Sequence, residues 1–103
     1  PITDWAAATW LLAAIADANF QMSEFEYARN ALYDAMACPD AVGNPFIHLR
    51  LGQCEFELNN LDRAQDELTR AYRGAGKELF AGEHPKYWAY VTTFLKLPEH
   101  EQG

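Results

Sequence analysis

A pattern of large and small apolar residues occurs twice in this chain of 103 residues, at an interval of 36 positions. Residues 10–36 match residues 46–72, and the paired positions are Trp10 with Phe46, Ile15 with Leu51, Ala16 with Gly52, Phe20 with Phe56, Phe25 with Leu61, Ala28 with Ala64, Leu32 with Leu68 and Ala35 with Ala71. A repeat of about 20–50 residues is typical of proteins built from stacked units that share a core and present a binding surface. At this length the chain is expected to be one domain.

Helical spacing of the apolar residues predicts two helices in each unit. In the first unit an alanine-rich segment, about 4–22, comes before Ser23, and Ser23 with Glu26 has the spacing of a capping box. We therefore expect the second helix to begin at Ser23. In the second unit, Asn44 followed by Pro45 predicts a helix start, because Asn caps well and proline is tolerated at the first helical position.

Small residues at matching places in the two units predict where helices touch. Ala16 and Gly52 fall in the middle of the first helix of each unit, and Ala28 and Ala64 fall early in the second. A large side chain at such a contact would overpack it. We therefore expect the helices to approach closely at these four positions.

The C-terminal part is not a third copy of the repeat. Gly74 and Gly76 are expected to end the second unit, and a helix rich in aromatic residues is predicted over about 84–97. Stacked repeats leave an apolar face at each end, so this helix is expected to act as a cap. The domain would then span 1–98, and the polar residues 99–103 are expected to be frayed.

Charge and apolar content exclude some classes of partner. Fifteen acidic and eight basic residues give a formal charge of −7, which disfavours binding to nucleic acid. The acidic surface either keeps the protein soluble or speeds its encounter with a basic partner. Asp17 breaks the longest apolar run, so no membrane association is expected. No signal peptide is visible, although the chain begins with Pro1 and residues upstream remain possible.

The sequence predicts no metal, cofactor or catalytic site. His48, His84 and His100 have no metal-ligand spacing, and no phosphate loop or nucleophile motif is present. His48 is expected to be a packing histidine. Cys38 and Cys54 are interpreted as free thiols in a reducing compartment, which favours a cytoplasmic protein.

The pattern of small and large residues resembles the tetratricopeptide repeat, a helix–turn–helix unit of about 34 residues. The resemblance covers about 8–76 and rests on these positions: Ile15, Ala16, Phe25, Ala28, Leu32 and Ala35 in the first copy, and Leu51, Gly52, Leu61, Ala64, Leu68 and Ala71 in the second. It implies an all-α fold of two hairpins, about 9–42 and 45–76, in a short right-handed solenoid with the C-terminal capping helix. Two features depart from the family: extra residues in the loop 39–44, and a closing proline, Pro39, only after the first copy.

Two short segments, 43–54 and 86–88, resemble a group of small bacterial cytosolic proteins of this family. Some of these are encoded near secreted toxins, which implies an immunity protein that occludes a toxin. The resemblance implies neither a substrate nor a type of toxin.

The family resemblance also implies a binding groove lined by the first helix of each unit. The residues expected to bind a partner there are Trp10, Asp17, Gln21, Phe46, Arg50, Gln53 and Glu57. Packing alone would explain several neighbours in the groove, above all Phe20, Leu49 and Phe56. Polar residues on an otherwise apolar face are less easily explained by packing.

The function expected from the sequence is therefore a non-catalytic module that binds a protein or peptide partner. The alternative is a self-associating scaffold or a fragment of a longer repeat protein, because two units are few for a stack. The chain is expected to be a monomer or a homodimer.

Overall fold

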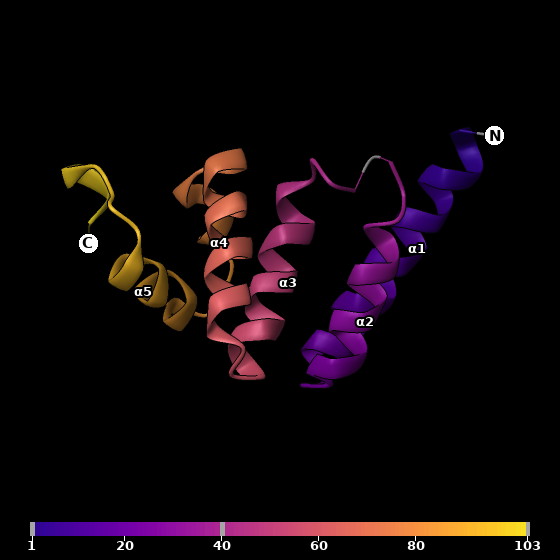
Figure 1. Cartoon of the computed structure of the whole chain (residues 1–103), viewed down its shortest axis with the longest axis horizontal. Coiled ribbons are helices and arrows are strands. Elements are labelled where there is room, and N and C mark those ends of the chain that lie inside the picture. Colours follow the sequence, from indigo (N-terminus) through magenta and orange to yellow (C-terminus); the bar gives the residue numbers. More distant parts are fainter. Residues whose placement is uncertain (1, 40, 103) are drawn as a thin grey trace.

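All regular structure described in the computed structural model is helical, which confirms the all-α expectation (Figure 1). The structure describes residues 2–39 and 41–102, with the backbone alone at 2–6. The elements are α1 (Ile2–Gln21), α2 (Phe25–Ala35), α3 (Pro45–Glu57), α4 (Leu61–Ala75), the 3-10 turn η1 (Lys77–Phe80), α5 (Pro85–Phe94) and the 3-10 turn η2 (Glu99–Glu101). None of the described helices is both long and apolar enough to cross a membrane.

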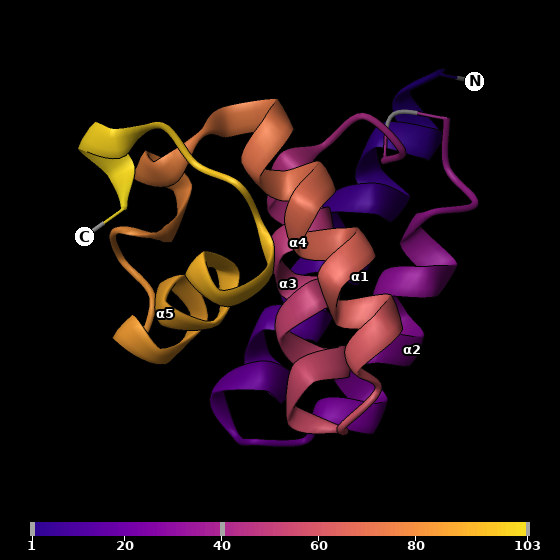
Figure 2. The ribbon, with the colours of Figure 1, turned by 60° about the vertical axis from the view of Figure 1, so that its left-hand side comes forward.

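The first four helices form two antiparallel hairpins that lie side by side (Figure 1). α1 packs on α2, α3 packs on α4, and α2 packs on α3 to join the hairpins. α5 lies beside α4 near the C-terminal end of the molecule, while the N-terminal half of α1 forms the opposite end (Figures 1 and 2). The longest dimension is 45 Å.

The turn inside each hairpin has the same geometry, 36 positions apart. The amides of Ser23 and Glu24 donate to the carbonyls of Phe20 and Asn19, and the amides of Asn59 and Asn60 repeat this with Phe56 and Glu55. Ser23 and Asn59 both adopt positive φ, at 60° and 64°. Each turn is a Schellman motif, in which a left-handed residue after the helix satisfies its last carbonyls.

This geometry makes one prediction wrong. Ser23 does not cap α2, because its backbone is used to end α1, and the N-cap position belongs to Glu24 without a capping side chain. Asn60 likewise precedes α4 without a side-chain cap, since its amide donates to Glu55 instead. In each hairpin, the hydrogen bonds of the turn therefore end the first helix, and no side chain in the turn caps the second helix.

Three further helix boundaries lie where they were predicted, whereas the aromatic helix predicted over about 84–97 ends earlier, at Phe94, and Gly74 lies inside α4. The Asn44 side chain accepts from the Phe46 amide at 2.9 Å, with Pro45 at the first helical position. His84 caps α5 in the same way, accepting from the Lys86 amide at 3.1 Å. Gly76, at φ 77°, ends α4.

The small residues lie where the sequence placed them, between closely packed helices. Ala16, Ala28 and Ala64 are fully buried. Gly52 faces α4 so closely that an added Cβ would lie 2.6 Å from the Cγ and Cδ2 atoms of Leu68. The close approach of α3 and α4 therefore requires glycine at this position.

Two apolar clusters hold the helices together. One joins α1, α2 and α3 around the buried residues Leu32, Ile47 and Leu51. The other joins α3, α4, η1 and α5 around Leu49 and Leu68, with Phe80, Tyr87 and Val91 from the C-terminal segment. The aromatic helix α5 therefore covers the outer side of α4, as a cap would.

The C-terminal segment expected to be frayed, 99–103, contains the 3-10 turn η2. Tyr72 of α4 donates a hydrogen bond to Glu101, and Gln102 donates to the carbonyl of Leu97 at 3.0 Å. Gly103 lies outside the described residues.

Candidate partner-binding surface

The residues expected to bind a partner lie along α1 and α3, and they fall into three groups. Trp10 and Phe46 line a hollow of about 410 Å³ between the two helices, together with Thr9, Ala13, Asn44 and Ile47. Trp10 is 78% exposed, whereas Phe46 is half-buried. A large exposed aromatic side chain beside a hollow is an arrangement that protein partners use as an anchor.

Three of the polar residues, Asp17, Arg50 and Gln53, meet in one hydrogen-bonded network. The Arg50 guanidinium donates to Asp17 at 2.9 Å and to Gln53 at 2.8 Å. It also donates to Glu83 at 2.5 Å, and the Gln53 amide donates to the same Glu83 oxygen at 2.9 Å. These contacts tie α1 and α3 to the segment before α5. The side chains of Asp17, Arg50 and Gln53 are therefore hydrogen-bonded within the chain itself, with no bound protein needed.

Arg50 is buried between aromatic rings as well as between carboxylates. Only 4% of the residue is exposed, and its guanidinium carbon lies 4.5 Å from the ring centroid of Phe20 and 4.9 Å from that of Phe46. Planar guanidinium groups stack on aromatic faces in this way. Its Nε atom has no hydrogen-bond partner among the described residues. Arg50 thus links α1, α3 and the segment before α5, and Phe20 packs against both apolar clusters, in line with the packing interpretation.

The remaining two residues lie beyond this network. Gln21 is exposed and borders a hollow of about 290 Å³ between the end of α1 and the start of α5. Glu57 accepts from the Tyr87 hydroxyl at 2.7 Å and pairs with Lys86 at 2.6 Å. Although partial burial raises the pKa of Glu57, the hydrogen bonds from Lys86 and Tyr87 outweigh it and lower that pKa. Glu57 therefore fixes α5 against α3.

Glu83 is the residue of this surface that the sequence did not reveal. It lies 33 positions after Arg50, just before the helix predicted over about 84–97. No local spacing pairs a carboxylate with an arginine so distant in the chain. An isolated arginine on an apolar helix face was the available signal that a buried counter-charge exists.

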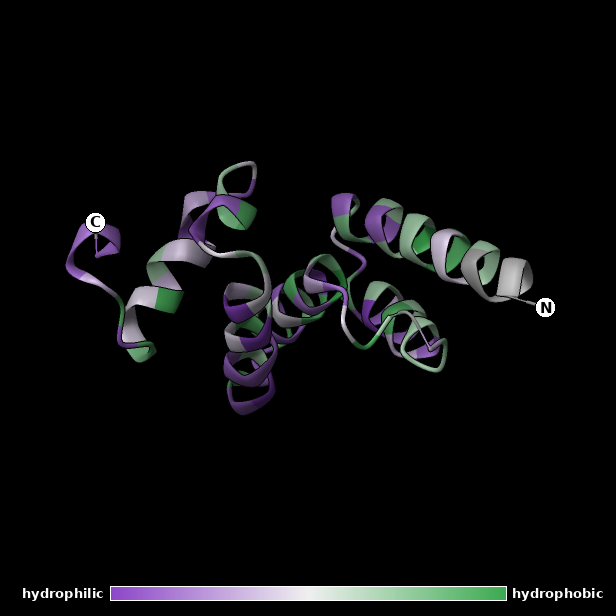
Figure 3. Ribbon diagram, turned by 90° about the horizontal axis from the view of Figure 1, so that it is seen from above, coloured by the Kyte–Doolittle hydropathy of each residue, from purple (hydrophilic) through white to green (hydrophobic). Residues whose placement is uncertain are grey.

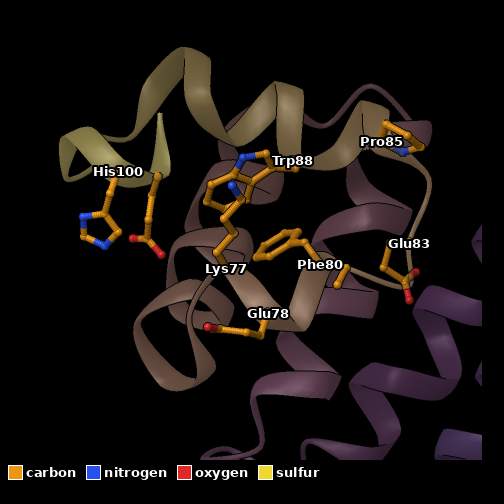
Figure 4. A pocket seen from close by; sticks show the side chains of 9 residues that line it. Lys77, Glu78, Phe80, Glu83, Pro85, Trp88 and His100 are labelled. Atoms are coloured by element: carbon orange, nitrogen blue, oxygen red, sulfur yellow. The ribbon is translucent and has the colours of Figure 1, made fainter. Parts of the chain in front are cut away.

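A third hollow, of about 540 Å³, lies between η1, the start of α5 and η2 (Figure 4). Phe80 and Trp88 form its apolar side, and their ring centroids are 5.2 Å apart. The Nζ atom of Lys77 lies 5.5 Å from the centroid of the Trp88 ring, and His100 lines the hollow from the C-terminal segment (Figure 4). The Trp88 Nε1 atom is buried without a partner in the described chain. This hollow was not predicted, because its walls come from three separate segments.

The remaining chemically active groups are involved in packing. His48 is buried, as expected, with Nδ1 at 3.0 Å from Glu67 and Nε2 at 2.6 Å from the carbonyl oxygen of Val42. Cys38 and Cys54 are buried free thiols, and burial raises the pKa of Cys54 to about 12. The described residues contain no group of three His, Cys, Asp or Glu side chains that could hold a metal ion.

No family model matches this chain, and no curated protein or solved structure matches it either. The function of these surfaces therefore has to be inferred from their own chemistry.

Proposed function

We propose that this protein is a non-catalytic module that binds a protein or peptide through the face formed by α1 and α3. The observation that carries the proposal is Trp10, which is 78% exposed beside the hollow that Phe46 lines. Exposing an indole to water forgoes the stabilisation that burying it would give. Such residues are the commonest energetic anchors of protein interfaces.

The hollow selects for an apolar side chain from the partner. Apart from Asn44 and Thr9, the side chains that line it are apolar or aromatic: Trp10, Ala13, Phe46 and Ile47. The next residue along the face is Asp17, whose side chain is 44% exposed although it is bonded to Arg50. An apolar residue followed by a cation in the partner suits this order, and the formal charge of −7 favours a basic partner at long range.

The hairpins are further proposed to be repeats of the tetratricopeptide type, in a short right-handed solenoid. Identical turns 36 positions apart, and small residues where paired helices touch, support this proposal. The most specific version of the proposed function is an immunity protein that binds and occludes a basic toxin. Co-expression with the product of the neighbouring gene tests that version, and the absence of both a complex and protection would exclude it.

The test of the binding face compares two exposed aromatic residues. Tagged wild-type protein, Trp10→Ala and Tyr27→Ala are used to capture proteins from the native cell, and the captured proteins are quantified by mass spectrometry. Tyr27 is the matched control, because it is 66% exposed but lies on α2, away from the hollow. We expect a partner that wild type and Tyr27→Ala retain and that Trp10→Ala loses, by about tenfold or more. Equal capture by all three proteins, or no specific capture, would contradict the proposal.

A further inference from the structure

The side of α1 that faces away from α2 carries an uncovered apolar stripe. It consists of Ala7, Leu11, Ala14, Ile15, Ala18 and Met22, all of them exposed. At the helical period these residues fall within an arc of about 100°. Leu11, Ile15 and Met22 are 63%, 43% and 65% exposed. Figure 3 shows α1 at the N-terminal edge of the molecule, with green and pale bands along most of its length and purple in its last turns.

In the second hairpin, the residues equivalent to this stripe are in contact with another helix. The residues 36 positions after Leu11, Ile15 and Ala18 are Ile47, Leu51 and Cys54 of α3. These three are 1%, 0% and 0% exposed, because α3 packs this side against α2. They share one apolar cluster with the alanines and Leu32 of α2. The same stripe is therefore a helix-packing face in one copy of the repeat and is left open in the other.

In a second copy of the chain, the faces of α2 and α4 that could receive this stripe are already covered by other helices. The α2 face is covered by α3 of its own chain, and α4 is covered by α5 through the bond from Gln65 to Tyr90 and the rings of Tyr72 and Trp88. The α1 stripe itself remains open. It is also uncharged, since none of its six residues is acidic or basic, and Asp17, the charged residue within 7–22, falls outside the arc of the stripe. Two such stripes can face each other without opposing like charges.

We propose that the α1 stripe pairs with the α1 stripe of a second copy, with the helices antiparallel. A two-fold axis between Ala14 and Ile15 places each large side chain opposite a small one. The contacts it generates are Leu11 with Ala18, Ile15 with Ala14, and Met22 with Ala7 of the other copy. Large residues opposite small ones let two helices interlock closely, and a self-complementary patch gives a closed dimer. This pairing uses a different side of α1 from the hollow at Trp10 and does not depend on the proposed function.

The first test is the oligomeric state of the full chain by sedimentation velocity, at concentrations up to about 1 mM. We expect a reversible dimer that Leu11→Glu and Ile15→Glu each weaken by about tenfold or more. Tyr27→Glu adds the same charge at a side chain that is 66% exposed elsewhere, and it is expected to leave the dimer unchanged. Salt should strengthen the dimer, because it screens the −7 charge on each copy. A monomer at every concentration, or a dimer insensitive to both stripe variants, would overturn the proposal.

Disulfide trapping tests the orientation of the two helices. Ala14→Cys lies beside the two-fold axis and is expected to cross-link to itself under mild oxidation. Met22→Cys is expected not to cross-link, because antiparallel pairing separates its two copies by about 22 Å along the helix. The native Cys38 and Cys54 are buried and do not compete. Cross-linking at both positions, or at neither, would refute antiparallel pairing.

Discussion

Gly52→Ala is the smallest change that tests the close packing of α3 on α4. The added methyl carbon would lie 2.6 Å from two side-chain carbons of Leu68 and 3.1 Å from its backbone nitrogen. Leu68 is fully buried, so its side chain has no free space into which to turn. Overpacking of this kind reduces stability by about 1–3 kcal/mol. Alanine also favours the helix by about 1 kcal/mol over glycine, which offsets part of the loss.

We place the overpacking near its upper limit, because both the side chain and the backbone of Leu68 are too close. The net loss is then about 2 kcal/mol, and Tm is expected to fall by about 10 °C in a domain of this size. Thermal unfolding, followed by circular dichroism, measures this change in Tm. Gly43→Ala is the control, since no atom lies within 4 Å of its added Cβ, and its effect is expected to stay within about 1 kcal/mol.

A second variant separates the clash from other effects of alanine. In a Leu68→Ala background the two side-chain carbons are gone and only the 3.1 Å contact with the backbone nitrogen remains, so Gly52→Ala is expected to be close to neutral there. The coupling between the two sites would then be about 2 kcal/mol. A Gly52→Ala protein with a Tm above wild type would show that only helix propensity acts at this position and would refute the reasoning.

Two further predictions concern groups that the fold buries. The pKa of Glu57 is lower in the folded protein than its unfolded value of about 4.3. Its carboxylate therefore stabilises the fold above that pH, and this stabilisation is lost as pH falls through the folded pKa. Glu57→Gln is expected to flatten the dependence of Tm on pH between about pH 5 and 3, and an unchanged slope would contradict it. Cys38 and Cys54 are expected to resist a thiol reagent at pH 8 in the native protein and to react in urea, because both are buried and the pKa of Cys54 is about 12; rapid native labelling would show that the core opens.

Periodicity and small residues predicted the helices and their close contacts correctly, because both follow from local spacing. Gly52 and Ala64 lie between helices as their positions in the repeat required. The start of α2 was wrong for a physical reason: Ser23 fits two turn chemistries, and the left-handed turn that ends α1 prevailed over the capping box. Only the backbone conformation distinguishes the two.

The candidate surface was harder to predict, because its contacts join residues distant in the chain. Asp17, Arg50 and Gln53 were predicted as partner-binding residues, and the sequence did not reveal that they bond to one another and to Glu83 in another segment. The sequence also did not reveal which apolar side chains are exposed to solvent. Leu11 and Ile47 occupy equivalent positions in the repeat, yet one is 63% exposed and the other 1%. Their exposed fractions differ because a neighbouring helix covers Ile47 and none of the described helices covers Leu11. The spacing of residues within one helix does not predict which neighbours that helix has.

Proton contacts in solution test the central claim, that two hairpins with equivalent small-residue contacts lie side by side. We expect nuclear Overhauser effects from the Gly52 α protons to the Leu68 methyl groups, and from the Leu51 methyl groups to the Ala28 and Leu32 side chains of α2. The first set reports the contact within a hairpin, and the second reports the contact between hairpins. Absence of both sets in a protein with native helicity would contradict the account.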